Sequence, residues 1–294
     1  MSLQTFLNEV NKNHMTVNYV QIRKNGVITE DYSRLESKTR LNTWSACKSI
    51  VSVAVGIAMD EGLIRLDERL VDSFQECLPE NIDKSLQELT VRDMLTMTTG
   101  LENALFFGDD PIRYRTKDWI SYFFNQSFSH ENGKKFLYCN FNTYMLACLV
   151  EKKAGQPFVD YLQPRLFGPL EIFSPDWTKC PMGHAHAANG LYVTIDELAN
   201  FGQMLLQNGN FGGKQIVSKA FLEEATKNQM PETETAVRYG YQFWISENND
   251  YYYASGKFGQ YCIVIPEKQA VVAIMSLESK DLMPLIREHI LAEI

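Results

Sequence analysis

The spacing of hydrophobic and polar residues predicts different elements in different parts of the chain. Residues 17–32, "VNYVQIRKNGVITEDY", place strand-forming residues on both sides of Asn25-Gly26, a strong turn signal for a β-hairpin. A helical repeat follows, made by the apolar residues Ile50, Val51, Val53, Ala54, Ile57 and Ala58. Two later segments, "TVRDMLTMTTG" and "TIDELANFGQMLLQNG", predict helices capped by Thr90 and Thr194.

The pattern changes after Tyr239. Four short β-rich runs, "GYQFWIS", "DYYYAS", "QYCIVIP" and "AVVAIMS", predict an antiparallel meander, and residues 281–293 predict a final amphipathic helix. Since strands lie at both ends and helices in the middle, we expect an α+β fold with one antiparallel sheet built from both chain termini and flanked by helices. We expect residues 1–75 and 186–294 to form this sheet lobe, residues 76–185 a mostly helical inserted lobe, and the cleft between them to hold the active site.

The composition is that of an ordinary globular protein, with 294 residues, 45% hydrophobic and 22% charged. The net charge of −8 and the absence of a Lys/Arg cluster argue against a nucleic-acid partner. No apolar run reaches the length of a membrane span, and the start "MSLQTFLNEVNKNH" does not have the pattern of a signal peptide. The six cysteines show no C-x-x-C spacing, so we expect free thiols and a cytoplasmic location. The oligomeric state is left open.

The first candidate for chemistry is the pair Ser45 and Lys48 at the start of "LNTWSACKSIVSVAVGIAMDEG". Side chains at i and i+3 share a helix face and can touch. A serine hydroxyl is a poor nucleophile until a base accepts its proton, and a lysine in apolar surroundings loses basicity and can act as that base. The S-x-x-K pattern also occurs by chance, and the alternative is a helix-capping serine beside a surface lysine.

The second candidate is "FLYCNFN", which holds Tyr138 and Asn140 just before a helix predicted to end at Gly155. A tyrosine near an ammonium is expected to have its phenolate favoured, which suits a proton shuttle. The asparagine offers both a donor and an acceptor to a substrate amide. Taken alone, such a pair at the junction of a loop and a helix more often reflects core packing and a helix cap.

The third candidate is "YYYASGKFGQYCIVIPE", where Ala254, Ser255 and Gly256 lie on a predicted edge strand. Small residues there let a substrate backbone lie against the sheet. The backbone N–H just past Gly256 would join that of Ser45 to hold an oxyanion. The alternative is a hairpin with glycines at its turn.

Two histidines, His184 and His186, share a face if their segment "GHAHAANG" is a strand. Because no third ligand lies at a recognisable spacing, we predict no metal site. A loop that enters the helix at Thr194 is the simpler interpretation.

The order and spacing of the three motifs, S-x-x-K, Y-x-N and x-[ST]-G, resemble the serine-reactive penicillin-recognising family. This family includes class C β-lactamases, D-alanyl-D-alanine carboxypeptidases and related esterases and amidases. Four other stretches are similar to family segments, "EGLIRLDERLVDSF", "ELTVRDMLTMTTGLE", "NGLYVTIDELANFGQMLLQNG" and "GQYCIVIPEKQAVVAIMS". The resemblance covers about residues 42–276 and implies the β-lactamase/transpeptidase fold, an acyl-enzyme mechanism and no cofactor.

The resemblance also implies a role for each matching residue. Ser45 would be the acylated nucleophile, and Lys48 and Tyr138 would activate it and protonate the leaving group. Asn140 would bind the acyl-side amide of the substrate. The N–H groups of Ser45 and Lys257 would form the oxyanion hole.

One departure from the family pattern affects the expected substrate. Ser255 and Gly256 match the substrate-binding strand, but Ala254 stands where the family commonly has Lys or His, a cation that helps receive the carboxylate of penicillin or D-Ala-D-Ala. Lys257 lies past the glycine, where strand alternation points it elsewhere. We therefore expect a small-molecule ester, amide or peptide as the substrate of an esterase or amidase. A β-lactamase, a D-Ala-D-Ala carboxypeptidase and a non-catalytic penicillin-binding or sensing protein are the alternatives, and specificity is expected in cleft-lining loops such as 101–116.

Overall fold

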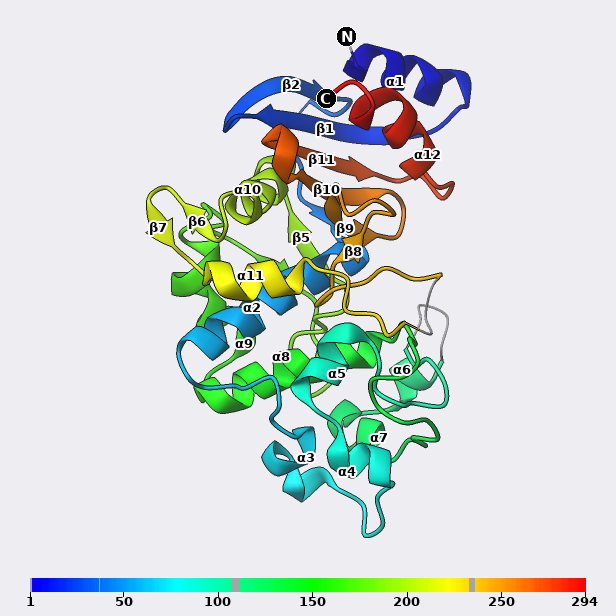
Figure 1. Cartoon of the computed structure of the whole chain (residues 1–294), viewed down its shortest axis with the longest axis vertical. Helices are drawn as coiled ribbons and strands as arrows, with labels where there is room; N and C mark the ends of the chain where they lie inside the picture. Colours follow the sequence, from blue (N-terminus) through cyan, green and yellow to red (C-terminus); the bar gives the residue numbers. More distant parts are fainter. Residues whose placement is uncertain (1, 37, 107–110, 233–235) are drawn as a thin grey trace.

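The computed structural model describes residues 2–36, 38–106, 111–232 and 236–294. Its largest sheet has six antiparallel strands in the order β2-β1-β11-β10-β9-β8 (Figure 1). The strands are β1 (Val17–Lys24), β2 (Val27–Ser33), β8 (Trp244–Ile245), β9 (Tyr252–Gly256), β10 (Gln260–Ile265) and β11 (Ala270–Ser276). The sheet therefore joins both ends of the chain, which confirms the predicted α+β fold, hairpin and meander.

Helices cover both faces of this sheet (Figure 1). On one face, α1 (Ser2–Lys12) packs with α12 (Met283–Ile286) and the π-helical turn η5 (Arg287–Leu291). On the other face lies α10 (Ile195–Leu206), with α2 (Cys47–Asp60) beyond it. Along β1, β9, β10 and β11, side chains alternate between the apolar clusters of the two layers. Helix α1 was not predicted from the sequence.

The remaining helices are short except for α8 (Asn140–Ala154), which packs against α2. The others are α3 (Leu70–Ser73), α4 (Lys84–Glu88), α5 (Val91–Thr96), α6 (Ile112–Arg115), α7 (Trp119–Phe124), α9 (Phe158–Leu162) and α11 (Lys219–Ala225). Thr90 and Thr194 both cap their helices as predicted, each in a capping box, and α8 ends at Gly155 in the left-handed conformation.

Two small sheets complete the fold. One has the order β3-β5-β4, from Leu41–Asn42, Leu191–Val193 and Asp176–Trp177, and the other pairs β6 (Asn210–Phe211) with β7 (Lys214–Gln215). A single hydrophobic cluster runs from the sheet through α2 to α8. The boundaries of the two expected lobes therefore stay a prediction.

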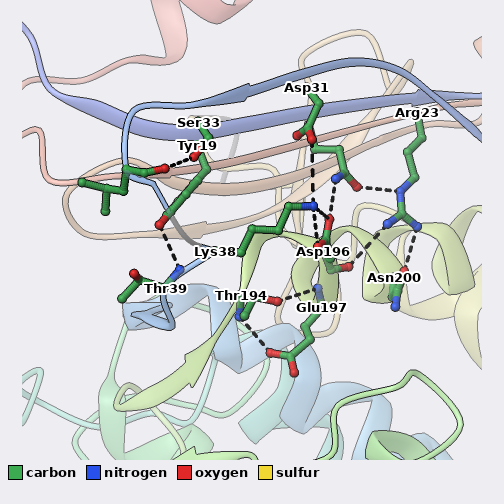
Figure 2. Close-up of polar contacts among 12 residues, drawn as sticks. Tyr19, Arg23, Asp31, Ser33, Lys38, Thr39, Thr194, Asp196, Glu197 and Asn200 are labelled. Carbon is green, nitrogen blue, oxygen red and sulfur yellow. Dashed lines mark hydrogen bonds and ion pairs between the residues drawn. The ribbon is translucent and has the colours of Figure 1, made fainter.

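A polar junction joins α10 to the sheet (Figure 2). Arg23 of β1 is only 8% exposed, and its guanidinium donates to Gln21 Oε1 at 2.8 Å and Asn200 Oδ1 at 2.9 Å. Nearby, Lys38 pairs with Asp196 at 2.6 Å. Because α10 supplies the acceptors Asn200 and Asp196, these bonds fix its position on the strand.

All six cysteines lie within the described residues and are free thiols, as predicted. Burial raises the pKa of the Cys47 thiol to about 12, so this residue inside the first motif is protonated at neutral pH. In the described ranges, no helix has the length and apolarity needed to cross a membrane.

Candidate active site

A turn of 3-10 helix, η1 (Trp44–Ala46), presents Ser45 immediately before α2. Trp44 has a φ of +47°, a left-handed conformation that is rare for a bulky residue and is held here by local bonds. Asn42 Oδ1 accepts from the N–H of Trp44 at 2.8 Å and from that of Gly190 at 3.1 Å. The turn places Ser45 in the wall of a cavity of about 470 Å³.

Lys48 lies behind Ser45 and is 1% exposed. Its ammonium donates to Ser45 Oγ at 3.3 Å, to Asn140 Oδ1 at 2.8 Å and to the carbonyl oxygen of Ala188 at 2.7 Å. These three acceptors are uncharged, so they do not offset the loss of hydration. Burial accordingly lowers the pKa of Lys48 to about 8. The loss of basicity predicted from the sequence is confirmed.

Tyr138 lines the same cavity and is hydrogen-bonded to the Ser45 side chain. Lys48 Nζ lies 5.2 Å from the centroid of its ring, and Trp244 stacks on it with centroids 5.8 Å apart. Burial raises the pKa of Tyr138, with the bond to Ser45 acting in the opposite direction. The expectation that the phenolate is favoured is therefore wrong, since desolvation outweighs the nearby polar groups and the phenol stays neutral.

Asn140 is the first residue of α8 and is 7% exposed. Its Oδ1 accepts from Lys48, and its Nδ2 donates to the carbonyl oxygen of Phe106 at 2.6 Å. Both ends of the amide are thus engaged within the protein, where they orient the Lys48 ammonium. The contact between Asn140 and a substrate amide stays a prediction.

Strand β9 approaches the turn η1, which carries Ser45, at Gly256. A Cβ on Gly256 would lie 2.2 Å from the carbonyl oxygen of Thr43 and 3.1 Å from the amide nitrogen of Ala46, so only glycine permits this approach. Ser255, Gly256 and Lys257 line the cavity together with Ser45. The structure thus brings the third motif beside the first, and the oxyanion hole stays a prediction.

Ala254 is 2% exposed and lies outside the set of residues that line this cavity. Strand alternation explains this, because Ser255 faces the cavity and its neighbour faces the core. The exposed Lys257 directs its ammonium to aromatic rings, 5.0 Å from the centroid of Phe258 and 6.0 Å from that of Trp44. Lys257 thus lines the same cavity as Ser45, with its ammonium near these two rings.

The other residues that line the cavity were not among the site residues predicted from the sequence. They are Trp244, Tyr253, Tyr261, Asp281, Met283, Pro284 and Arg287. For Tyr253 a signal existed, since it precedes Ser255 by two positions and so shares its face of the strand. Arg287 belongs to no motif, and long-range packing of the C-terminal turn brings it here.

The two histidines occupy separate environments. His184 Nδ1 lies 2.7 Å from Glu151 Oε1, and this hydrogen bond raises the pKa of His184. His186 packs edge-on against Trp119, with ring centroids 5.3 Å apart. Within the described ranges, no three His, Cys, Asp or Glu side chains are grouped as a metal site.

Comparison with known protein families gives one match over almost the whole chain. The sequence model described as Beta-lactamase matches residues 12–291. Among curated proteins, the chain is 24% identical over 242 residues to an uncharacterized protein of Alkalihalophilus pseudofirmus and 27% identical over 194 residues to 6-aminohexanoate-dimer hydrolase of Paenarthrobacter ureafaciens. These alignments cover 72% and 61% of this chain but only 65% and 48% of the relatives.

Solved structures share the fold at low sequence identity. EstCE1, described as a hydrolase with promiscuous acyltransferase activity, superposes with a TM-score of 0.80 at 14% identity, over 98% of both chains. An octameric penicillin-binding protein homologue from Pyrococcus abyssi gives a TM-score of 0.78 at 17% identity, over 99% of this chain and 77% of that one. At such identities the likeness establishes the fold alone.

Proposed function

Because the chain belongs to the Beta-lactamase family, we propose that it is a serine hydrolase that cleaves a small ester or amide through an acyl-enzyme on Ser45. One observation carries the proposal, the 3.3 Å contact between Ser45 Oγ and the buried Lys48 ammonium. A lysine whose pKa falls to about 8 exists partly as the free amine near neutral pH. The amine can then accept the serine proton.

The proposed reaction has two halves. As the proton of Ser45 passes to the neutral Lys48 amine, Oγ bonds to the substrate carbonyl carbon and the carbonyl electrons move to its oxygen. When this intermediate collapses, the bond to the leaving alcohol or amine breaks. Tyr138 donates its proton to that group and regains one from Lys48. Water then attacks the carbonyl carbon of the ester on Ser45, and its proton passes through Tyr138 to Lys48. Lys48 returns this proton to Oγ as the bond between Oγ and the acyl carbon breaks, and the acid is released.

The state of Tyr138 suits this assignment. Its raised pKa keeps the phenol protonated, so it carries a proton to give to a leaving group. Its hydrogen bond to Ser45 places that proton beside the bond that breaks. Tyr138 is therefore proposed as the proton donor, and Lys48 as the base.

The developing oxyanion would be held by the backbone N–H groups of Ser45 and Lys257. The close approach of Gly256 to η1 supports this role, because it brings the end of β9 to the nucleophile turn. The start of α2 adds a favourable dipole for negative charge.

The environment of Ala254 favours an ester or amide over a β-lactam or a D-Ala-D-Ala peptide. Its buried methyl group cannot receive a carboxylate, whereas the family's usual cation at this position does. The hydrolase name of the relative from Paenarthrobacter ureafaciens is consistent with amide cleavage.

Hydrolysis of 4-nitrophenyl acetate by the purified chain and by Ser45→Ala tests the proposal. We expect Ser45→Ala to lose turnover by at least about 10³-fold, as nucleophile removal does in serine hydrolases. Ser52→Ala is a matched control, because Ser52 is buried in the same helix α2. Equal turnover by the wild type and Ser45→Ala would contradict the proposal.

A further inference from the structure

A second cavity, also of about 470 Å³, lies next to the nucleophile turn. Trp44 and Asn42 line it, whereas Ser45 lines the first cavity. Consecutive Cα atoms are about 3.8 Å apart, so neighbouring residues of the same turn, Trp44 and Ser45, line the two cavities. The other walls of the second cavity come from α6, from Trp119 of α7 and from residues 178–190.

Among the described residues, the charged side chains that line this second cavity are of one sign. Arg113 and Lys179 both line it, and no carboxylate is found among the described residues of its wall. Trp44, Tyr114 and Trp119 supply aromatic surface. Such a lining suits a group that combines a negative charge with an apolar spacer.

His186 gives an independent sign that a ligand group belongs here. Its side chain is 6% exposed and lines the cavity, yet neither ring nitrogen has a hydrogen-bond partner among the described residues. Buried polar atoms are nearly always paired. Burial, with Lys48 and Arg113 nearby, lowers the pKa of His186 to about 3, so the ring is neutral and offers one N–H donor and one acceptor.

The position of the proton donor decides which part of a substrate enters the second cavity. The proposed proton donor Tyr138 lines the first cavity, so the leaving group must lie there to be protonated. The acyl part then extends to the other side of Ser45, past Trp44. We propose that the second cavity binds a carboxylate at the far end of the acyl chain, held by Arg113, Lys179 and His186. The substrate would thus be a half-ester or half-amide of a short dicarboxylic acid, an inference that rests on the proposed function.

Two matched esters test this proposal, 4-nitrophenyl hydrogen glutarate and the neutral 4-nitrophenyl pentanoate, which has the same number of acyl carbons. We expect the wild type to prefer the glutarate ester by at least tenfold in kcat/KM. In Arg113→Gln/Lys179→Gln this ratio should fall toward one. Lys268→Gln, which removes an exposed lysine at the far end of β10, serves as the charge control.

Arg287 and Lys257 are the competing cations, because both line the first cavity, so Arg287→Gln and Lys257→Met are measured beside the double variant. A preference lost in Arg287→Gln or Lys257→Met but kept in the double variant would overturn the proposal, as would hydrolysis of both esters at equal kcat/KM. Binding of glutarate to Ser45→Ala does not depend on turnover. Tryptophan fluorescence can follow this binding because Trp44 and Trp119 line the second cavity. If neither ester is hydrolysed by the wild type, the proposed function fails, and saturable quenching by glutarate that is lost in the double variant would still support the cavity assignment.

Discussion

Lys48 and Arg23 are two cations that the fold buries to a similar degree, at 1% and 8% exposure. Lys48 meets only uncharged acceptors among its hydrogen-bond partners, and burial brings its pKa to about 8. Arg23 also donates to neutral side-chain acceptors, but the carboxylate of Asp196 lies close enough to oppose the effect of burial on its pKa (Figure 2).

The two side chains differ in what burial does to them: it changes the proton affinity of Lys48, whereas it leaves Arg23 a fixed hydrogen-bond donor between two elements. A guanidinium stays protonated in proteins, and its planar fork suits fixed bonds such as those between β1 and α10. An ammonium has a pKa near enough to neutrality for burial to turn it into a base. The side chain of Lys48 can therefore gain and lose a proton, and that of Arg23 cannot.

The largest expected effect is a loss of ester turnover on substitution of Lys48. Lys48→Arg keeps the charge but removes the group able to accept the Ser45 proton, so ester turnover should fall by about 10³-fold or more. Circular dichroism and steady-state kinetics measure this together. Folded protein with turnover within tenfold of the wild type would show that Lys48 is not the base.

The reverse exchange should act on stability instead. Arg23→Lys keeps the charge but loses the forked bonds to Gln21 and Asn200, and we expect it to lower the free energy of unfolding by roughly 1–3 kcal/mol. Urea titration measures the loss, and Arg65→Lys, at an exposed ion pair with Asp67, is the control with a far smaller expected change. A drop in kcat of the folded Arg23→Lys protein as large as that of Lys48→Arg would contradict the purely structural role of Arg23.

The pH dependence of turnover should report the lowered pKa of Lys48. Because the free amine is the active form, kcat/KM should rise about tenfold per pH unit below the pKa near 8 and level off above it. The measurement needs an ester whose own rate of hydrolysis is subtracted at each pH. A flat profile between pH 6 and 9 would argue against a lysine base.

The smallest effect is expected from a third cation, which is exposed. The Lys257 ammonium faces the rings of Phe258 and Trp44 in solvent, and only the backbone N–H of this residue is proposed to act. Lys257→Met should therefore change kcat/KM for a neutral ester by less than about threefold, since exposed charges contribute little. A loss of a hundredfold would assign a role to the side chain itself.

Much of the fold follows from local signals. The capping boxes at Thr90 and Thr194, the hairpin at Asn25-Gly26 and the C-terminal meander each depend on a few neighbouring residues. The three motifs also carry their order and spacing in the sequence. Helix α1 was not predicted, although Leu3, Phe6, Leu7 and Val10 form a helical repeat of apolar residues.

The parts that could not be predicted depend on burial or on contacts distant in sequence. The protonation state of Tyr138 was misjudged because desolvation by Trp244 and its other neighbours is a property of the packed structure. Arg287 reaches the first cavity only through packing of the C-terminal turn. Of the loop 101–116 expected to set specificity, Arg113 and Tyr114 line the second cavity, and residues 107–110 lie outside the described residues.

Intact-mass spectrometry after incubation with a fluorophosphonate tests the central claim most directly, because this reagent reports an activated serine whatever the natural substrate is. The account predicts a single adduct on the wild-type chain, formed faster above pH 8 than at pH 6, and no adduct on Ser45→Ala. An equal adduct on Ser45→Ala, or an unmodified wild-type chain that still hydrolyses 4-nitrophenyl acetate, would contradict it.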